Sequence, residues 1–286
     1  MGTSKNQEAA SGAAVKKRGQ FKEIWRRLKK IKMAMIGLGI VALLVLISIF
    51  ADFLFDYNTV VIKQNTAIRL QTPSAAHWLG TDEFGRDILA RLVHGSRVSL
   101  SVGVVAVSIA LLIGGSLGAI AGFYGGKIDN VIMRIMDIFQ AIPAILMAIA
   151  VVAVLGNGII QLVVAMSIAF MPNVAKTCRA AIFTVKGSEY VDASRAIGVS
   201  QFKIIIRHLV PNAIGVIVID TVGMVGAAIL MVSTLSYIGV GIVPPTPEWG
   251  AILSAGKEYI RSGVHMVLFP GLMIMLTVIS FNLFGD

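Results

Sequence analysis

The chain has 286 residues, of which 56% are hydrophobic and only 14% are charged. A soluble domain of this size could not hide so much apolar surface in one core, so the composition excludes an ordinary soluble protein and favours the lipid bilayer as solvent. The net charge of +10 is uneven, because ten Lys and Arg residues precede residue 34 and only Glu8 and Glu23 oppose them.

Residues 1–33 form a basic tail that leads directly into the first apolar stretch. Apolar side chains recur in it at helical spacing between Lys and Arg, which predicts a helix lying in the lipid headgroup plane; they are Phe21, Ile24, Trp25, Leu28 and Ile31. A basic tail beside a spanning helix is typical of the cytoplasmic side, so we expect a cytoplasmic N-terminus and no nucleic-acid partner. No cleavable signal peptide is expected, since a polar tail of about thirty residues precedes the first apolar stretch.

Five apolar stretches can supply membrane spans, each of which needs about 20 residues. Residues 33–51, 98–126, 138–175 and 264–284 contain no Lys, Arg, Asp or Glu, and 211–243 contains only Asp220. The third stretch is long enough for two helices broken at Gly156-Asn157-Gly158. The sequence therefore predicts an all-α integral membrane protein with about six transmembrane helices, residues 34–286 being the transmembrane domain.

The loops follow from this count. With the N-terminus inside, about 52–96 and about 241–263 lie outside, and about 176–210 lies inside. This inner loop carries six Lys and Arg residues against Glu189 and Asp192, so charge and expected topology agree.

Small and charged residues inside the spans give three further expectations. Gly114, Gly118 and Gly122 share one helix face, on which a neighbouring helix should pack closely. Arg134 and Asp137 are three residues apart, so we expect them to pair. Asp220 lies on the order of 12 Å into its span, and we expect it to face the solute pathway.

The sequence contains no recognisable catalytic or nucleotide-binding motif. A phosphate-binding loop needs G-x-x-x-x-G-K-[ST]. The nearest candidate, Gly125-Gly126-Lys127, has Ala121 in place of the first Gly and Ile128 in place of the hydroxyl residue. We interpret this segment as a tight turn. The single Cys178 lacks the neighbours of a metal site, and the four histidines are dispersed. We therefore expect no enzyme and no metal site, and any ATPase must be a separate protein.

The inner loop has the pattern of two short helices. The stretch 189–198 ends in Gly198, where the chain can turn sharply, and an amphipathic segment at 199–208 then leads to Pro211, which is expected to open the next span. Asp192-Ala193-Ser194 with Gly198 and Pro211 resembles the Glu-Ala-Ala coupling motif of ATP-driven importer permeases. Asp replaces the usual Glu, and Ser the second Ala.

Three further stretches resemble the C-type permease subunits of dipeptide, oligopeptide and nickel importers. The first is LGTDEFGRD at 79–87 with GSRVSL at 95–100, and the second is YGG at 124–126 with the segment to Pro143. The third comprises LSYIG at 235–239, PPTPEWG at 244–250, and FNLFGD at 281–286. The resemblance runs from about Trp78 to the end, and it implies a type I ABC importer permease architecture.

The resemblance also implies partners and site residues. The partners would be a second homologous permease, two ATP-binding subunits that hold ATP and magnesium, an extracellular or periplasmic solute-binding protein, and lipid of a bacterial or archaeal plasma membrane. The ATPase-coupling surface would be formed by Glu189, Asp192, Ala193, Ser194, Gly198 and Pro211. Contacts with the binding protein are expected at Asp82, Arg86, Asp87, Pro245 and Trp249, unless these residues only fix turns and an anchor.

The sequence indicates the family more specifically than it indicates the solute. Val232 stands where many members carry an acidic residue, so the pathway lining here can differ. Peptides are the expected solute, and a nickel or other metal chelate is the alternative within the family. An ATP-independent channel or secondary transporter is the alternative from another class, although it leaves the coupling motif unexplained.

Overall fold

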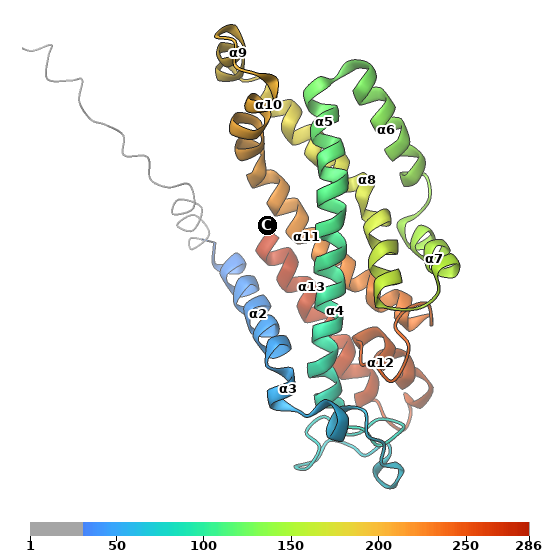
Figure 1. Ribbon diagram of the computed structural model, residues 1–286. Helices are drawn as coiled ribbons and strands as arrows, with labels where there is room; N and C mark the ends of the chain where they lie inside the picture. The colour runs from blue at the N-terminus through green and yellow to red at the C-terminus, as the bar shows by residue number, and fades with distance from the viewer. Residues whose placement is uncertain (1–30, 286) are drawn as a thin grey trace, which may run out of the picture.

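The structure is a computed structural model that describes residues 31–285. The expected headgroup helix of the basic tail, apart from Ile31, lies outside these residues. The chain folds into an elongated helical bundle (Figure 1). The helices are α2 (Lys32–Ile49), α3 (Ala51–Leu54), α4 (Ile88–Ala110), α5 (Ser116–Tyr124), α6 (Gly126–Gln140), α7 (Ala144–Leu155), α8 (Ile159–Lys186), α9 (Glu189–Ala196), α10 (Gln201–Ile204), α11 (Val210–Tyr237), α12 (Trp249–Gly256) and α13 (His265–Gly285).

The prediction of about six spans is confirmed. Five helical stretches are long and apolar enough to cross a membrane, namely α2, α4 to α5, α8, α10 to α11, and α13. A sixth span arises if α6 and α7 count as one, because they pass the same test together although they are bent by 81°. The predicted break between two helices is also present, since residues 156–158 separate α7 from α8.

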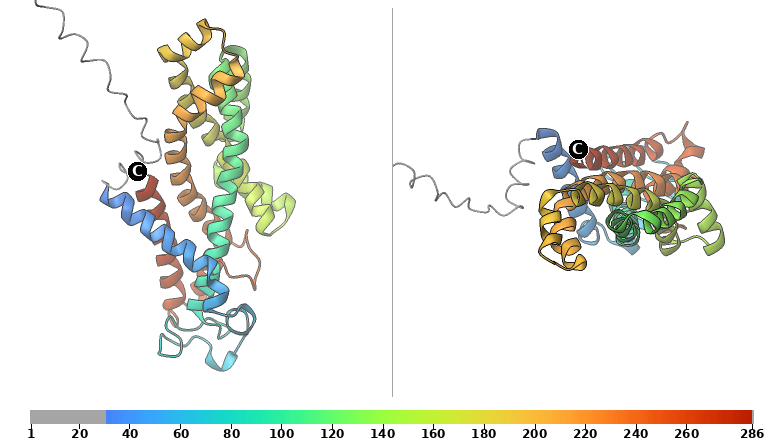
Figure 2. Two further views of the ribbon diagram at one scale, coloured as in Figure 1. Left: turned by 60° about the vertical axis from the view of Figure 1, so that its left-hand side comes forward. Right: turned by 90° about the horizontal axis from the view of Figure 1, so that it is seen from above.

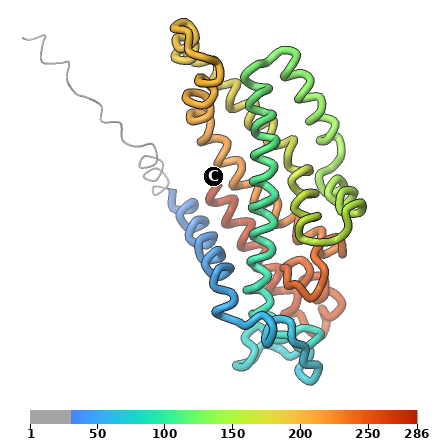
Figure 3. The backbone as a smooth tube through the Cα atoms, in the orientation of Figure 1, coloured from blue at the N-terminus to red at the C-terminus, as the bar shows by residue number. Residues whose placement is uncertain are grey.

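The two ends of the bundle differ in character. α9 and α10 lie at one end, here called the α9 end, whereas α12 and the long connection between α3 and α4 lie at the other, called the α12 end (Figure 1). In Figure 2, α2 runs beside α13, and their packing is close because a Cβ on Gly37 would meet the Ser280 carbonyl oxygen at 2.6 Å. Figure 3 shows α4 and α5 as one rod through the bundle.

The predicted small-residue face packs against α8, and both helices belong to this chain. A Cβ placed on Gly118 would lie 2.1 Å from the carbonyl oxygen of Ala175. A Cβ placed on Gly114 or Gly122 would lie 2.6 Å from a backbone oxygen of α8. Without side chains at these positions the two backbones come into direct contact, which is how small residues join helices where water cannot drive association.

α4 begins at Ile88, so it starts within residues 52–96, the segment expected to form a loop. The Asp87 carboxylate caps its first turn by accepting the Ala90 N–H at 2.9 Å. Arg97 donates to Asp52 at 2.9 Å, and His94 lies 2.8 Å from the Phe55 carbonyl oxygen. These partners satisfy the hydrogen-bonding groups of Arg97 and His94. The first turns of α4 can therefore contain polar residues that a hydropathy pattern places outside a helix.

Residues 176–210, the other segment expected to form a loop, are also largely helical. α8 continues to Lys186, and a π-helical segment, η4 (Ile205–Leu209), joins α10 to α11, so one helical stretch runs from Gln201 to Tyr237. Pro211 lies in the first turn of α11 as expected, but it does not open the span. Two of the three cations in residues 176–186 find partners on α6, where Arg179 binds Asp129 at 2.5 Å and Lys176 binds Asp137 at 2.6 Å.

The expected pair between Arg134 and Asp137 is wrong. Asp137 instead forms an ion pair with Lys176 of α8, with 2.6 Å between Oδ1 and Nζ. Spacing along one helix favours a local partner, but it cannot show that another helix brings a cation closer.

Candidate functional site

The α9 tip, residues 189–202, is the most exposed structured part of the α9 end. Tyr190, Ile197 and Phe202 have exposed fractions of 42%, 80% and 75%. Glu189, Asp192 and Ala193 are exposed beside them. A surface with apolar groups between carboxylates is typical of a protein contact site.

The tip is held rigidly although its surface is exposed. Val191 is fully buried and packs in a cluster with Ile182, Ile204 and Leu209 from α8, α10 and η4. A cluster that joins three helical segments fixes the direction in which α9 projects. Any force applied to α9 therefore reaches the helices that carry it.

The turn after α9 is a Schellman motif. Gly198 has φ +76°, its N–H donates to the Arg195 carbonyl at 3.0 Å, and the Val199 N–H donates to the Ser194 carbonyl at 3.1 Å. Glycine is favoured in this left-handed conformation because it has no Cβ. The sharp turn expected at Gly198 is therefore present. Ser194 Oγ also donates to the Tyr190 carbonyl at 2.8 Å, and Arg195 donates to Asp192 at 3.2 Å.

A buried carboxyl organises the α12 end. Glu248 is fully buried at the N-cap of α12, where its Oε2 accepts the Ala251 N–H at 2.9 Å. Its Oε1 accepts Ser99 Oγ of α4 at 3.0 Å and Ser233 Oγ of α11 at 3.3 Å. One side chain thus ties three helices together. A carboxyl directly before an apolar helix is an N-cap signal that the sequence analysis missed.

Next to it, a charge cluster lies beneath α12. Arg86 donates to Asp82 at 2.6 Å and to Glu83 at 3.3 Å, and Arg91 Nε lies 3.4 Å from Asp82. Burial, together with the neighbouring Asp82 carboxylate, raises the pKa of Glu83. Glu83 also borders an open hollow of about 500 Å³ whose lining includes Asn157, Lys257 and Tyr259, so this end offers polar surface.

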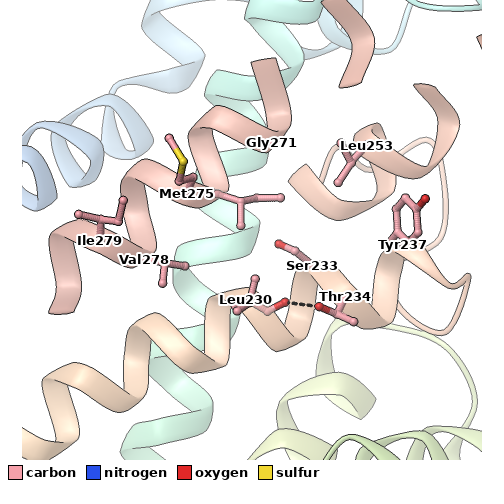
Figure 4. A pocket seen from close by; sticks show the side chains of 10 residues that line it. Leu230, Ser233, Thr234, Tyr237, Leu253, Gly271, Met275, Val278 and Ile279 are labelled. Atoms are coloured by element: carbon pink, nitrogen blue, oxygen red, sulfur yellow. Dashed lines mark hydrogen bonds between the residues drawn. The ribbon is translucent and has the colours of Figure 1, made fainter. Parts of the chain in front are cut away.

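A second hollow, of about 510 Å³, lies between α11, α12 and α13 (Figure 4). It is lined by apolar side chains, and the Thr234 hydroxyl is already bonded to the Leu230 carbonyl at 2.8 Å. None of its lining residues carries a charge, so it offers no partner for an ionic solute.

The two predicted pathway residues lie in different surroundings. Asp220 is half-buried and borders a hollow of about 350 Å³ with Asn282, between α11 and the last turn of α13. Among the described residues its side chain forms no hydrogen bond or ion pair. Val232 is fully buried in the main apolar core.

Comparison with known proteins identifies the family. The family described as "Binding-protein-dependent transport system inner membrane component" matches residues 114–286, and the "N-terminal TM domain of oligopeptide transport permease C" matches residues 19–73. The chain belongs to this family of permeases. The residues matched by the first model include the α9 tip, α11 and α12.

Named relatives and solved structures agree with this placement. The dipeptide transport system permease protein DppC of Alkalihalophilus pseudofirmus is 42% identical over 93% of this chain and 87% of the relative. The glutathione transport system permease protein GsiD of Pectobacterium atrosepticum is 38% identical over 94% of this chain and 89% of the relative. An inward-facing structure of the MetNI methionine ABC transporter has the same fold, with TM-score 0.58 and 20% identity over 70% of this chain and 94% of that chain.

The permease buries three of the five residues that were predicted to contact a binding protein. Trp249, Asp82 and Arg86 are at most 4% exposed, and Trp249 Nε1 donates to the Leu92 carbonyl at 3.0 Å. These side chains hold the α12 end together, so in this structure they are not available for a direct contact. Pro245 is exposed and Asp87 is half-buried, and they remain candidates for that contact.

Proposed function

We propose that this permease is one subunit of an ATP-driven importer and forms half of the translocation pathway for di- or oligopeptides. The α9 tip carries this proposal, because it combines an exposed apolar surface with a buried anchor and the residues of the coupling motif. It docks into a separate ATPase subunit that binds ATP and magnesium. The permease itself performs no catalysis.

The proposed assembly contains a second homologous permease, two ATPase subunits and a solute-binding protein. The α9 end and the N-terminus face the cytoplasm of a bacterial or archaeal cell. The α12 end faces outward, where Pro245 and Asp87 lie within reach of the binding protein. The positive charge of the tail supports this orientation, and the relatives' names support peptides as solutes.

A pull-down from detergent-solubilised native membranes tests the coupling role. The variant with Asp192→Arg and Gly198→Trp should lose the ATPase subunits, because it reverses a charge and places a bulky side chain at a left-handed position. The second permease should remain bound, since the spans are unchanged. Asp192→Glu keeps the carboxylate and should retain the ATPases.

A second variant separates docking from misfolding of the turn. Ile197→Asp introduces a charge at an exposed position and leaves the glycine turn intact, and it should also lose the ATPases. Retention of the ATPases by both disruptive variants, or transport by the purified chain alone, would contradict the proposal.

For solute selection, we propose that Asp220 meets a cationic side chain of the peptide. Asp220→Asn should lower ATP-driven uptake of alanyl-lysine relative to alanyl-alanine by about tenfold, the loss expected for one charge-assisted hydrogen bond. The measurement is uptake of both labelled dipeptides by the reconstituted importer, with Asp220→Glu as the charge-preserving control. An equal loss for both peptides would assign Asp220 a structural role.

A further inference from the structure

α6 rests on α8 through paired polar side chains. Nearest the α9 end, Asp129 accepts two hydrogen bonds from Arg179 at 2.5 and 2.6 Å. About two turns further along α6, Asp137 binds Lys176 at 2.6 Å. Gln140 follows, accepting from Lys176 and donating to Asn173 Oδ1 at 3.1 Å.

The two ion pairs differ in the exposure of their carboxylates, whereas the cations are alike, with Arg179 41% and Lys176 40% exposed. The Asp129 side chain is only 14% exposed, and its bidentate bonds with Arg179 have the geometry of a structural tie. Asp137 and Lys176 are 61% and 40% exposed. Packing of α6 onto α8 therefore leaves this second pair accessible.

A hollow of about 210 Å³ adjoins the accessible pair where α6 bends into α7. Gln140 and Asn173 line it, together with Pro143 at the bend and Pro172 inside α8. Because Pro172 has no N–H, the helical hydrogen bond to the Ile168 carbonyl is missing at this level. Five polar groups thus lie within about two turns of α8. They are a carboxylate, an ammonium group, two amides and the carbonyl that lacks its helical hydrogen bond.

Placing these charged and amide side chains in contact with lipid would cost free energy, because lipid offers them no hydrogen-bond partners. Charged and amide side chains within spanning helices face protein or a water-filled cavity, where they mark the route of a polar solute. Lys176 lies about 25 Å along α8 from Ile159 at 1.5 Å per residue, so the group is within reach of the α9-side membrane surface. The accessible pair is therefore tolerated where it faces water, either at this membrane surface or in a water-filled part of the pathway.

We propose that Asp137, Lys176, Gln140 and Asn173 form a site for the charged ends of a short peptide. Asp137 binds the terminal ammonium, Lys176 binds the terminal carboxylate, and the two amides bond to the peptide backbone. This proposal rests on the proposed function, since it specifies where the imported peptide is held in this subunit.

The resting ion pair does not obstruct this role. An exposed ion pair contributes little to stability, so separating Asp137 from Lys176 costs little. The flexible stem of Lys lets its ammonium move away from Asp137, and an extended dipeptide spans about 7 Å. The peptide replaces one contact between the two side chains with one contact at each of its own ends.

Protection from a thiol reagent tests the site in the complete importer. Ile142→Cys in a Cys178→Ala background places one exposed thiol in the lining of the hollow, outside the four proposed binding residues, and its reaction with a water-soluble maleimide is followed in reconstituted vesicles. Alanyl-alanine should slow this reaction, whereas N-acetyl-alanyl-alanine amide, which lacks both charges, should not. Uptake of alanyl-alanine is measured in the same vesicles.

Variants of α6 identify the group that binds the amine. Asp137→Asn should raise the alanyl-alanine concentration for half-protection by about tenfold or more, the value of one charge-assisted hydrogen bond. Asp137→Glu should restore most of the protection. Arg134→Gln is the matched control, because Arg134 lies one turn away, is exposed, and should leave protection unchanged.

The proposal is overturned if the thiol does not react, if both peptides protect equally, or if neither protects while uptake continues. In the last case the importer function stands and only the site is wrong. Absence of uptake by the unmodified importer would instead reject the proposed function.

Discussion

Replacing Glu248 with alanine should lower the free energy of unfolding by about 4 kcal/mol, because three buried donors lose their acceptor at once. Ser99, Ser233 and the Ala251 N–H all donate to its carboxyl, and the side chain is fully buried. Its removal also leaves a cavity among α4, α11 and α12. The α12 end should therefore separate before the rest of the bundle.

Thermal unfolding in detergent measures this effect. Cys178 is buried, so its reaction with a thiol-reactive dye reports global unfolding. In a Trp25→Phe, Trp78→Phe background, the emission of fully buried Trp249 reports the α12 end. Glu248→Gln keeps one acceptor and should cause a smaller loss. Glu258→Ala, which removes an exposed carboxylate from the same end, should change neither signal. Equal stability of Glu248→Ala and Glu258→Ala would show that the carboxyl does not hold the helices together.

Gly118→Leu should destabilise the bundle by about 3 kcal/mol or more, since the new side chain meets backbone rather than a movable group. A Cβ at this position would lie 2.1 Å from the Ala175 carbonyl oxygen, so α5 and α8 must separate. The yield of monodisperse protein should fall, and Cys178, which faces Gly115 across the same contact, should react faster with the dye.

The matched control for this substitution is Gly215→Leu. Gly215 also lies inside a helix, but a Cβ there would meet nothing within 4 Å. Leucine has a higher helix propensity than glycine, so the control should be neutral or slightly stabilising. A comparable loss of stability in both variants would mean that the bundle does not tolerate leucine in general. The contact between α5 and α8 would then not explain the result.

Apolar runs and glycine positions gave most of the fold in advance. The break at Gly156-Asn157-Gly158, the sharp turn at Gly198 and the close packing at Gly118 follow from local chemistry that is visible in the sequence. The helix ends at Ile88 and Lys186 were not foreseen, because hydropathy counts Arg97 and Arg179 as loop residues. Only folding of the chain brings Asp52 to Arg97 and Asp129 to Arg179.

The candidate sites were predictable where they are local and missed where they are assembled from distant segments. The α9 tip is one short stretch, so its motif could be recognised from the residues alone. The partnership of Asp137 with Lys176 joins residues from two helices, and the burial of Trp249 and Val232 depends on packing across the bundle. A single sequence contains no signal for such contacts, and the nearer Arg134 was the natural but wrong choice.

The unbroken helix from Gln201 to Tyr237 has a mechanical consequence. Its 37 residues extend about 55 Å at 1.5 Å per residue, which makes it a lever arm longer than the bilayer is thick. A tilt of about 5° at one tip would displace the other by about 5 Å, a distance close to one helical turn. Motion applied beside α9 can thereby reach the opposite membrane face through one covalent element.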